Sequence, residues 1–241
     1  MKIGSVPFLN ALPLHLALGN PVILHPPVVL AEKLAGGEVD AALVPVVECL
    51  RDAGRGYVLV DGVAIASRGP VESVILALAK EGGPIRSVAL DRTSVTSAAL
   101  TRVLLEKYRG LRPEYREEGQ PADAQLWIGD RALEFRRNFP SAAVLDLGEA
   151  WQSATGLPFV YALWAVRPDA ATPALARALR EAKEAGLRRR GEIAANPAEH
   201  RYLTESIRYD LGTEEKEGLL RFARDLIEWG ILNKVPELTW I

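Results

Sequence analysis

Short apolar runs of strand length alternate with helix patterns along most of the chain, and this alternation limits the fold more than any other feature. Gly, Pro or Asp follows many of the runs and breaks the pattern before the next helix begins. Such alternation is typical of α/β proteins with largely parallel sheets. The expected strands are residues 2–6, 22–25, 41–44, 58–66, 73–79, 87–90, 124–128, 143–146 and 159–164.

The C-terminal part of the chain carries three signals for the start of a helix. Thr172 and Asn196 are good N-cap residues, and each is followed by a proline at the first helical position. Thr213 is followed by two glutamates, which are favourable in a first turn because of the helix dipole. We therefore expect the last strands to be followed by a helical region.

The order of these elements predicts two α/β lobes, with the chain crossing twice between them. The strands at 73–79 and 159–165 are the expected crossing segments. One lobe would consist of residues 1–84 and 160–241, and the other of residues 85–159. Ligands in such proteins lie between the lobes, at the carboxyl ends of strands.

Composition excludes several classes of protein. The 241 residues can bury a sizeable core, and the formal net charge of −2 argues against a nucleic-acid partner. The single cysteine, Cys49, allows no internal disulfide and lies in an apolar stretch typical of a core. No apolar run approaches the length of about eighteen residues that a membrane span needs, and residues 1–5 do not resemble a secretion signal. We expect a cytoplasmic protein without a membrane partner.

Four loops follow expected strands and are predicted to face the cleft, namely residues 7–13, 45–48 and 91–97 and the neighbourhood of Asp130. A fifth loop, residues 155–158, leads from an acidic, Trp-bearing helix directly into the strand at 159–164. A loop so rich in specific residues is either a wall of a binding cleft or an ordinary joint between helix and strand.

Four hydroxyl residues begin the helix after the strand at 87–90: Thr93, Ser94, Thr96 and Ser97. Free backbone N–H groups and the helix dipole favour an anion there, and hydroxyls add donors for carboxylate or phosphate oxygens. Capping needs only one of the four, so an anion site is the favoured interpretation and simple capping the alternative. The glycines and the lysine of a phosphate-binding Walker loop are missing.

Asn10 stands between Pro7 and Pro13, just after the first strand. Its side chain either closes an Asx turn or holds a substrate hydroxyl or carboxylate. Metal ligand spacing, a dinucleotide-binding glycine motif and a nucleophile elbow are all missing from the sequence. The histidines His15, His25 and His200 are expected to be structural or exposed rather than catalytic.

Five motifs in order resemble the chorismate dehydratase family of the futalosine route to menaquinone. The resemblance spans at least residues 2–166 and implies a type II periplasmic-binding-protein fold. It also implies a cytoplasmic hydro-lyase, without metal or cofactor, that removes water from chorismate to give 3-[(1-carboxyvinyl)oxy]benzoate. The motifs are Phe8-Leu9-Asn10-Ala11-Leu12-Pro13, Asp40-Ala41-Ala42-Leu43-Val44-Pro45, Ser94-Val95-Thr96-Ser97, Ile128-Gly129-Asp130 and Thr155-Gly156-Leu157-Pro158-Phe159.

The resemblance also implies roles for individual residues. Asn10 matches an active-site asparagine, and Ser73 is the best match to an implicated serine on the first crossing strand. Val95 replaces an arginine that is usual in the family, and Arg92 is the nearby candidate to replace its charge. Asn10 and Ser73 are thus the catalytic candidates. The substrate-binding candidates are Pro45, Val46, Arg92, Thr93, Ser94, Thr96, Ser97, Asp130, Thr155, Gly156 and Leu157.

Chorismate carries two carboxylates, and its dehydration removes the C3 proton and the C4 hydroxyl. Because no histidine is expected in the cleft, we hypothesise that the enolpyruvyl carboxylate of the substrate takes the proton and that Asn10 orients this carboxylate. Ser73 and the hydroxyls of residues 93–97 would hold the carboxylates. Two alternatives remain: 1,4-dihydroxy-6-naphthoate synthase of the same pathway, and a non-catalytic solute-binding protein for a small carboxylate.

Overall fold

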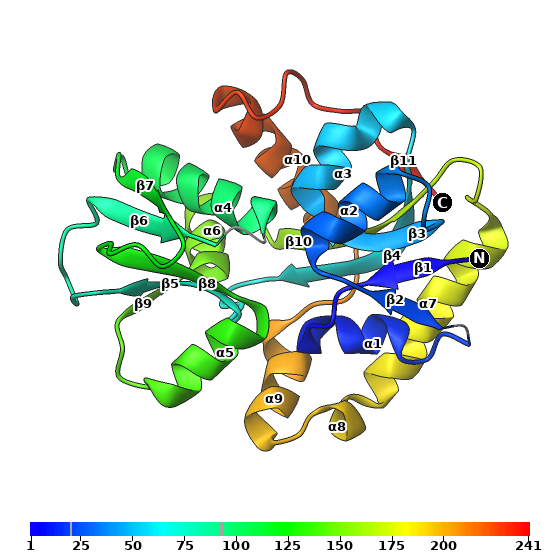
Figure 1. Ribbon diagram of the computed structural model, residues 1–241, viewed down its shortest axis with the longest axis horizontal. Helices are drawn as coiled ribbons and strands as arrows, with labels where there is room; N and C mark the ends of the chain where they lie inside the picture. The colour runs from blue at the N-terminus through cyan, green and yellow to red at the C-terminus, as the bar shows by residue number, and fades with distance from the viewer. Residues whose placement is uncertain (20, 92–93) are drawn as a thin grey trace.

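The computed structural model describes residues 1–19, 21–91 and 94–241, and it contains two mixed α/β units side by side (Figure 1). The first lobe, as we name it, is built on a six-stranded sheet in the order β11-β4-β10-β3-β1-β2. Its strands are β1 (Ile3–Ser5), β2 (Val22–Leu24), β3 (Ala41–Pro45), β4 (Val58–Ser67), β10 (Phe159–Val166) and β11 (Thr239–Trp240).

The second lobe is built on a five-stranded sheet in the order β7-β6-β8-β5-β9. Its order matches that of β2-β1-β3-β10-β4 in the first lobe, so the two sheets repeat one topology. Its strands are β5 (Val74–Leu78), β6 (Ser87–Leu90), β7 (Glu114–Glu117), β8 (Ala124–Ile128) and β9 (Val144–Asp146).

Most strands of each sheet are parallel, as expected, but one strand in each sheet runs against the others. All pairings of β5 and β10 described by the structure are antiparallel, whereas the other strand pairings are parallel. Both reversed strands are the first strand after the chain has crossed from the other lobe. Such a strand enters its sheet from the cleft, whereas the parallel strands end at the cleft.

The sheet to which β5 belongs indicates where the chain passes from the first lobe to the second. This strand was expected in the first lobe, but it pairs with β8 and β9 of the second sheet. The division of the chain stays a proposal, and we now place its first crossing between Ser67 and Val74 rather than near residue 84. The return crossing leads from β9 through the helix at residues 147–155 into β10.

Helices cover both sheets, and most lie where the sequence predicts them. Thr172 and Asn196 cap their helices, each accepting from the backbone N–H three residues later. The helices are α1 (Leu12–His15), α2 (Pro27–Ala35), α3 (Val46–Arg51), α4 (Val95–Arg102), α5 (Gly129–Asn138), α6 (Leu147–Thr155), α7 (Pro173–Arg188), α8 (Arg190–Ile193), α9 (Pro197–Arg201) and α10 (Thr213–Glu228), with the 3₁₀ turns η1 (Leu9–Ala11) and η2 (Asp52–Arg55) and the π turns η3 (Val103–Tyr108) and η4 (Tyr202–Ser206).

The sequence analysis missed the elements η1, α1, β7 and β11. The loop expected at residues 7–13 contains η1 and the start of α1. Strand β7 has the polar sequence Glu-Tyr-Arg-Glu and lies at the edge of its sheet, where no apolar alternation is needed. Strand β11 is only two residues long.

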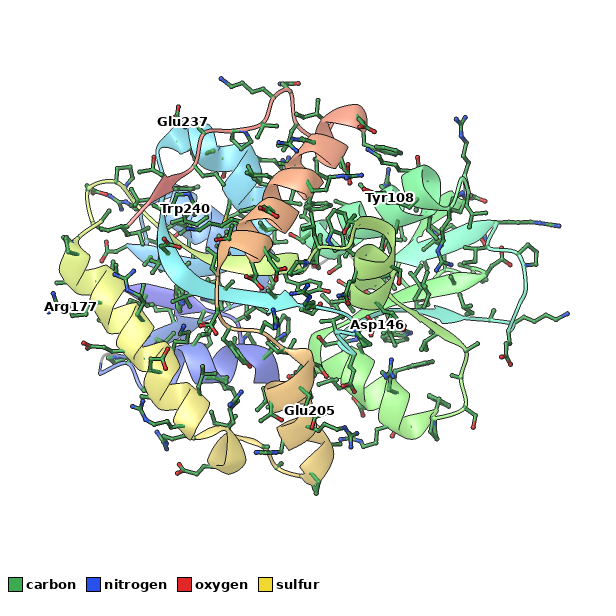
Figure 2. All side chains as sticks on the ribbon, turned by 180° about the vertical axis from the view of Figure 1, so that it is seen from behind. Tyr108, Asp146, Arg177, Glu205, Glu237 and Trp240 are labelled. Atoms are coloured by element: carbon green, nitrogen blue, oxygen red, sulfur yellow. The ribbon has the colours of Figure 1, made fainter. Side chains whose placement is uncertain are left out.

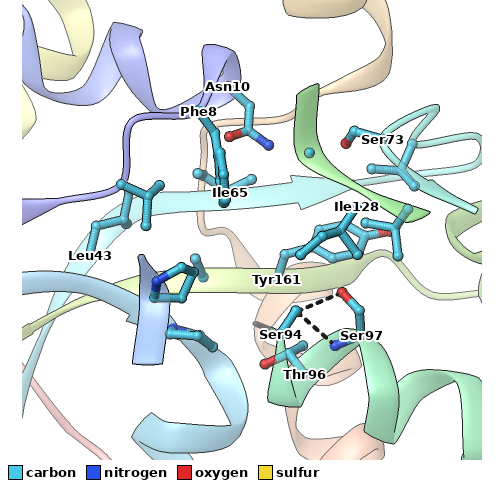
Figure 3. A pocket seen from close by; sticks show the side chains of 17 residues that line it. Phe8, Asn10, Leu43, Ile65, Ser73, Ser94, Thr96, Ser97, Ile128 and Tyr161 are labelled. Atoms are coloured by element: carbon cyan, nitrogen blue, oxygen red, sulfur yellow. Dashed lines mark hydrogen bonds between the residues drawn. The ribbon is translucent and has the colours of Figure 1, made fainter. Parts of the chain in front are cut away.

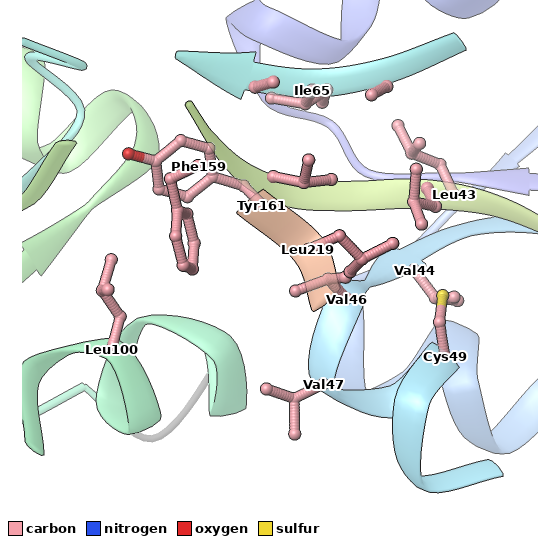
Figure 4. Packing of buried hydrophobic residues seen from close by; sticks show 14 of the residues in the cluster. Leu43, Val44, Val46, Val47, Cys49, Ile65, Leu100, Phe159, Tyr161 and Leu219 are labelled. Carbon is pink, nitrogen blue, oxygen red and sulfur yellow. The ribbon is translucent and has the colours of Figure 1, made fainter. Parts of the chain in front are cut away.

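A continuous apolar cluster packs under both sheets (Figure 4). It includes Leu100 of α4, Phe159 and Tyr161 of β10, and Leu219 of α10, so it extends from one lobe into the other. Cys49 belongs to this cluster and is 2% exposed, as its apolar neighbourhood predicts. None of the helices within the described ranges is long and apolar enough to cross a membrane.

A polar contact at the C-terminal helix also joins the lobes. Asp225 of α10 is buried and accepts hydrogen bonds from Lys107 Nζ at 2.8 Å and from the Tyr108 hydroxyl at 2.7 Å. Tyr108 is labelled in Figure 2, which shows the molecule from behind. This contact holds η3 of the second lobe against α10.

Candidate functional site

A cavity lies between the lobes, at the end of the sheets where the parallel strands finish (Figure 3). It encloses about 610 Å³ of space, counting its open mouth. Its lining is mostly apolar with a few convergent polar groups, as is typical of small-molecule sites. The lining residues are Val6, Phe8, Asn10, Pro27, Leu43, Pro45, Ile65, Val71, Ser73, Val74, Ser94, Thr96, Ser97, Ile128, Gly129, Tyr161 and Ala162.

Asn10 reaches this cavity from η1, directly after β1. The Asn10 side chain interacts with the hydroxyl of Tyr202 and lowers its pKa, whereas its Oδ1 atom is buried without a hydrogen-bond partner among the described residues. A buried acceptor without a donor costs about 1–3 kcal/mol. A ligand that donates a hydrogen bond at this point of the cavity would remove that cost.

Ser73 lies opposite, on the crossing segment before β5, and it is 1% exposed. Its Oγ accepts a hydrogen bond from the Tyr202 hydroxyl at 2.8 Å, so its own hydroxyl hydrogen is left for another acceptor. Its backbone oxygen accepts from Gly129 N at 2.7 Å. Ser73 is therefore fixed from both lobes.

Asp146 holds the residues that precede Ser73. Its carboxylate accepts from the backbone N–H groups of Val71 at 3.0 Å and Glu72 at 2.8 Å, and it also caps α6. Burial raises the pKa of Asp146 even though these hydrogen bonds lower it. Asp146 thus ties the two crossing segments to each other.

The start of α4 brings Ser94, Thr96 and Ser97 to the cavity. Ser94 is the N-cap: its Oγ accepts from Ser97 N at 3.2 Å and donates to Ser97 Oγ at 2.8 Å. Thr96 Oγ1 accepts from Val47 N of the first lobe at 3.1 Å. Thr96 and Ser97 each accept a hydrogen from the protein and keep their own for an acceptor in the cavity.

These contacts account for capping, and the anion site stays a prediction. Arg92 and Thr93, which were candidates for it, lie outside the described residues. No Lys or Arg lines the cavity in the described part of the chain. The donors that this part offers to an anion are therefore hydroxyl, amide and backbone N–H groups.

Asp130 and the loop after β3 occupy less direct positions. Asp130 Oδ1 accepts from Leu9 N at 3.0 Å, which ties α5 to the segment that carries Asn10. Burial and the charge of Glu199 raise the pKa of Asp130, and the Leu9 hydrogen bond opposes them. Asp130 faces a separate groove between α5 and α9. Pro45 lines the cavity, whereas Val46 is fully buried and does not.

The structure does not bring residues 155–157 to the cavity. Thr155 Oγ1 donates to Trp151 O at 2.8 Å and accepts from Leu157 N at 3.2 Å. Gly156 has a φ of 75° and ends α6, a conformation that glycine adopts without strain. This loop is the joint between helix and strand that was the alternative interpretation.

The histidines do not enter the cavity either. His15 is 5% exposed, its Nδ1 lies 2.8 Å from Ser5 Oγ, and burial lowers its pKa. Within the described ranges, no group of three or more His, Cys, Asp and Glu side chains could hold a metal ion.

Sequence reasoning missed two tyrosines at the site. Tyr161 of β10 lines the cavity, and its hydroxyl lies 3.1 Å from Ser67 Oγ. Tyr202 of η4 stands behind Asn10 and Ser73 and contacts both. The apolar run around Tyr161 indicates only a buried strand. Nothing local to Tyr202 indicates a partner 129 residues earlier in the chain.

Comparison with known proteins gives one consistent family. Residues 1–228 match the family model described as menaquinone biosynthesis. A chorismate dehydratase of Thermus thermophilus is 34% identical over 93% of this chain and 94% of its own length. A chorismate dehydratase of Campylobacter jejuni is 27% identical over 93% of this chain and 96% of its own length.

A solved structure supports the fold. The Candida albicans CA3427 gene product, described as having the generic periplasmic binding protein fold, has a TM-score of 0.65 at 13% identity. The match covers 97% of this chain and 91% of that one. The two-lobe fold implied by the sequence motifs is confirmed.

Proposed function

The chain belongs to the menaquinone biosynthesis family, and we propose that it acts as a chorismate dehydratase. The observation that carries this proposal is the meeting of Asn10 and Ser73 at one cavity between the lobes, in a chain similar to curated chorismate dehydratases. The sequence motif at residues 8–13 predicts Asn10, and the family resemblance implies Ser73. Their common partner, Tyr202, supports a shared site.

The open hydrogen-bonding groups fit the substrate. Chorismate has one ring hydroxyl, at C4, which is the group that leaves. Asn10 Oδ1 is an acceptor without a partner among the described residues, so it would accept the hydrogen of this hydroxyl. This assignment revises the hypothesis that Asn10 orients a carboxylate. Asn10 Oδ1 and a carboxylate oxygen are both acceptors, so they cannot form a hydrogen bond with each other.

The hydroxyls of Ser73, Thr96 and Ser97 each retain a hydrogen for an acceptor. We assign them to the two carboxylates of the substrate, whose oxygens accept hydrogen bonds. The enolpyruvyl carboxylate of the substrate takes the C3 proton, because the described lining holds no histidine, lysine or carboxylate. The electron pair of the C3–H bond forms the C3–C4 double bond that completes the aromatic ring, and the C4–O bond breaks. The carboxylate then gives its proton to the departing hydroxide, which leaves as water.

The proposal also covers the cellular location of the protein and its partners. We place the reaction in the cytoplasm, with chorismate as the small-molecule partner and without a cofactor or a nucleic-acid partner. The formal net charge of −2 supports the last point.

Incubation of the purified protein with chorismate tests the function. Mass spectrometry should show a product lighter by one water, and the ultraviolet spectrum should become that of a benzoate. Unchanged chorismate would contradict the proposal. Stabilisation by chorismate without turnover would then select a binding protein, and turnover of the cyclised futalosine product would select 1,4-dihydroxy-6-naphthoate synthase.

A further inference from the structure

The π turn η4 contacts the crossing segment with two side chains. The Tyr202 hydroxyl donates to Ser73 Oγ at 2.8 Å, and Ser206 Oγ donates to the carboxylate of Glu72. Glu72 has a φ of 61°, a left-handed conformation that is unfavourable for residues other than glycine. Such a conformation persists where its surroundings hold it, and these contacts do so beside a site residue.

Tyr202 itself stands behind the cavity. It is 2% exposed and does not belong to the cavity lining, although its hydroxyl meets side chains from both walls. One wall provides Ser73 Oγ and the other the amide of Asn10. Burial raises the pKa of Tyr202, so the phenol remains protonated and able to donate at neutral pH.

These contacts determine which atoms face a substrate. Because Tyr202 donates to Ser73 Oγ, the serine cannot turn its own hydrogen toward Tyr202. The Asn10 side chain also interacts with this hydroxyl, and its Oδ1 is the atom that has no partner among the described residues. A single phenol thus sets the orientation of two polar groups, one from the first lobe and one from the crossing segment.

We infer that Tyr202 is a positioning residue for the proposed dehydration: its hydroxyl orients Ser73 as a donor and Asn10 as an acceptor toward chorismate. This inference rests on the proposed function. Tyr202 acts through these two residues and does not touch the reacting atoms. Its removal should therefore slow the chemical step more than it weakens substrate binding.

The test compares two variants that each remove one buried phenolic oxygen. Tyr202→Phe removes the shared partner of Asn10 and Ser73. Tyr209→Phe is the matched control, since Tyr209 is 3% exposed and its hydroxyl has no hydrogen-bond partner among the described residues. We expect Tyr202→Phe to lower kcat on the order of 10- to 100-fold, with KM changed by no more than about threefold. Tyr209→Phe should retain the kcat of the unmodified protein.

A double variant separates positioning from general loss of structure. If Tyr202 acts through Ser73, adding Tyr202→Phe to Ser73→Ala should cost less than the product of the two single losses in kcat/KM. If the losses in kcat/KM of the two single variants multiply fully in the double variant, the inference is overturned. This holds even if Tyr202→Phe alone has a lower kcat.

The outcomes also distinguish this inference from the proposed function. An unmodified protein that leaves chorismate unchanged would overturn both. An active unmodified protein whose Tyr202→Phe variant keeps the same kcat would overturn only the role of Tyr202. Thermal unfolding of each variant in the absence of substrate shows whether a lower kcat accompanies a lower fraction of folded protein.

Discussion

The loops after β1 and after β6 occupy equivalent places in two sheets of the same strand order, yet they bring different chemistry to the cavity. The first loop provides Phe8 and Asn10, whereas the second provides Ser94, Thr96 and Ser97. The strand order determines where a loop meets the cavity. The side chains on that loop determine what it can do there.

The two loops also differ in which polar atoms lack a hydrogen-bond partner within the protein. Ser94 and Ser97 bond to each other at the start of α4, and Thr96 bonds to Val47 across the cleft. The Oδ1 atom of Asn10 has no such partner in the described part of the chain. We infer that the first loop acts on the leaving group and the second mainly binds the carboxylates.

Removal of the Asn10 side chain should have the largest effect. Asn10→Ala deletes the acceptor that would orient the C4 hydroxyl, and kcat should fall at least on the order of 10²-fold, because the reacting C4–O bond loses its alignment. Steady-state kinetics with chorismate measures this loss. Full turnover by Asn10→Ala would remove the functional difference between the two loops.

An alanine substitution in the equivalent loop, after β6, should mainly weaken substrate binding. Ser94→Ala deletes the N-cap of α4 and should lower the free energy of unfolding by about 1 kcal/mol. KM should rise because Ser97 loses its partner, while kcat changes far less than in Asn10→Ala. Chemical denaturation and steady-state kinetics check both parts. A kcat loss as large as that of Asn10→Ala would contradict the assignment.

The loops after β3 and β8 give a second contrast. Gly129 begins α5 with a φ of 57°, whereas Val46, which begins α3 at the equivalent place, does not have a positive φ. A Cβ added to Gly129 would lie 3.5 Å from the Phe8 ring. Gly129→Ala should therefore lower the free energy of unfolding by about 1–2 kcal/mol. Gly54→Ala is the control, because its Cβ would meet no atom within 4 Å and its φ is not positive. Equal stability of the two variants would argue against strain at Gly129.

The smallest effect concerns pH. Asp130 follows Gly129, and its pKa is raised in the folded protein, chiefly by burial. The folded state therefore holds this proton more tightly than the unfolded state, and the resulting stability is lost as pH rises through the folded pKa. Asp130→Asn keeps an oxygen that can accept from Leu9 N but cannot titrate.

As pH rises from about 4, the ordinary pKa of an aspartate, through the raised pKa of Asp130, the free energy of unfolding of Asp130→Asn should consequently fall less than that of the unmodified protein. Val47, at the equivalent position in the first lobe, has no titratable group. Urea denaturation at several pH values measures the difference. Identical slopes would show that Asp130 does not contribute to this dependence.

Much of the architecture was predictable because the signals are local. Apolar runs gave most strands, and Thr172-Pro173 and Asn196-Pro197 marked helix starts. The reversed β5 and β10 were not predicted, since direction depends on the side from which a crossing strand enters. The polar edge strand β7 carried no apolar pattern.

The residues of the candidate site also divide into those that the sequence predicts and those that it does not. Asn10, Ser73 and the hydroxyls after β6 follow strands or stand in crossing segments, so topology placed them near the cavity. Residues 155–157 also follow a helix near a crossing, but their hydrogen bonds close the end of α6 instead. Tyr202 could not be found, because its role depends on tertiary contacts with two distant segments.

The most direct test of this account is a crystal structure of the Ser73→Ala variant with chorismate. We predict that the substrate lies between the two loops, with its C4 hydroxyl within hydrogen-bond distance of Asn10 Oδ1 and its carboxylates near Thr96 and Ser97. Chorismate bound in the groove between α5 and α9, or with its C4 hydroxyl turned away from Asn10, would contradict the division of roles between the lobes.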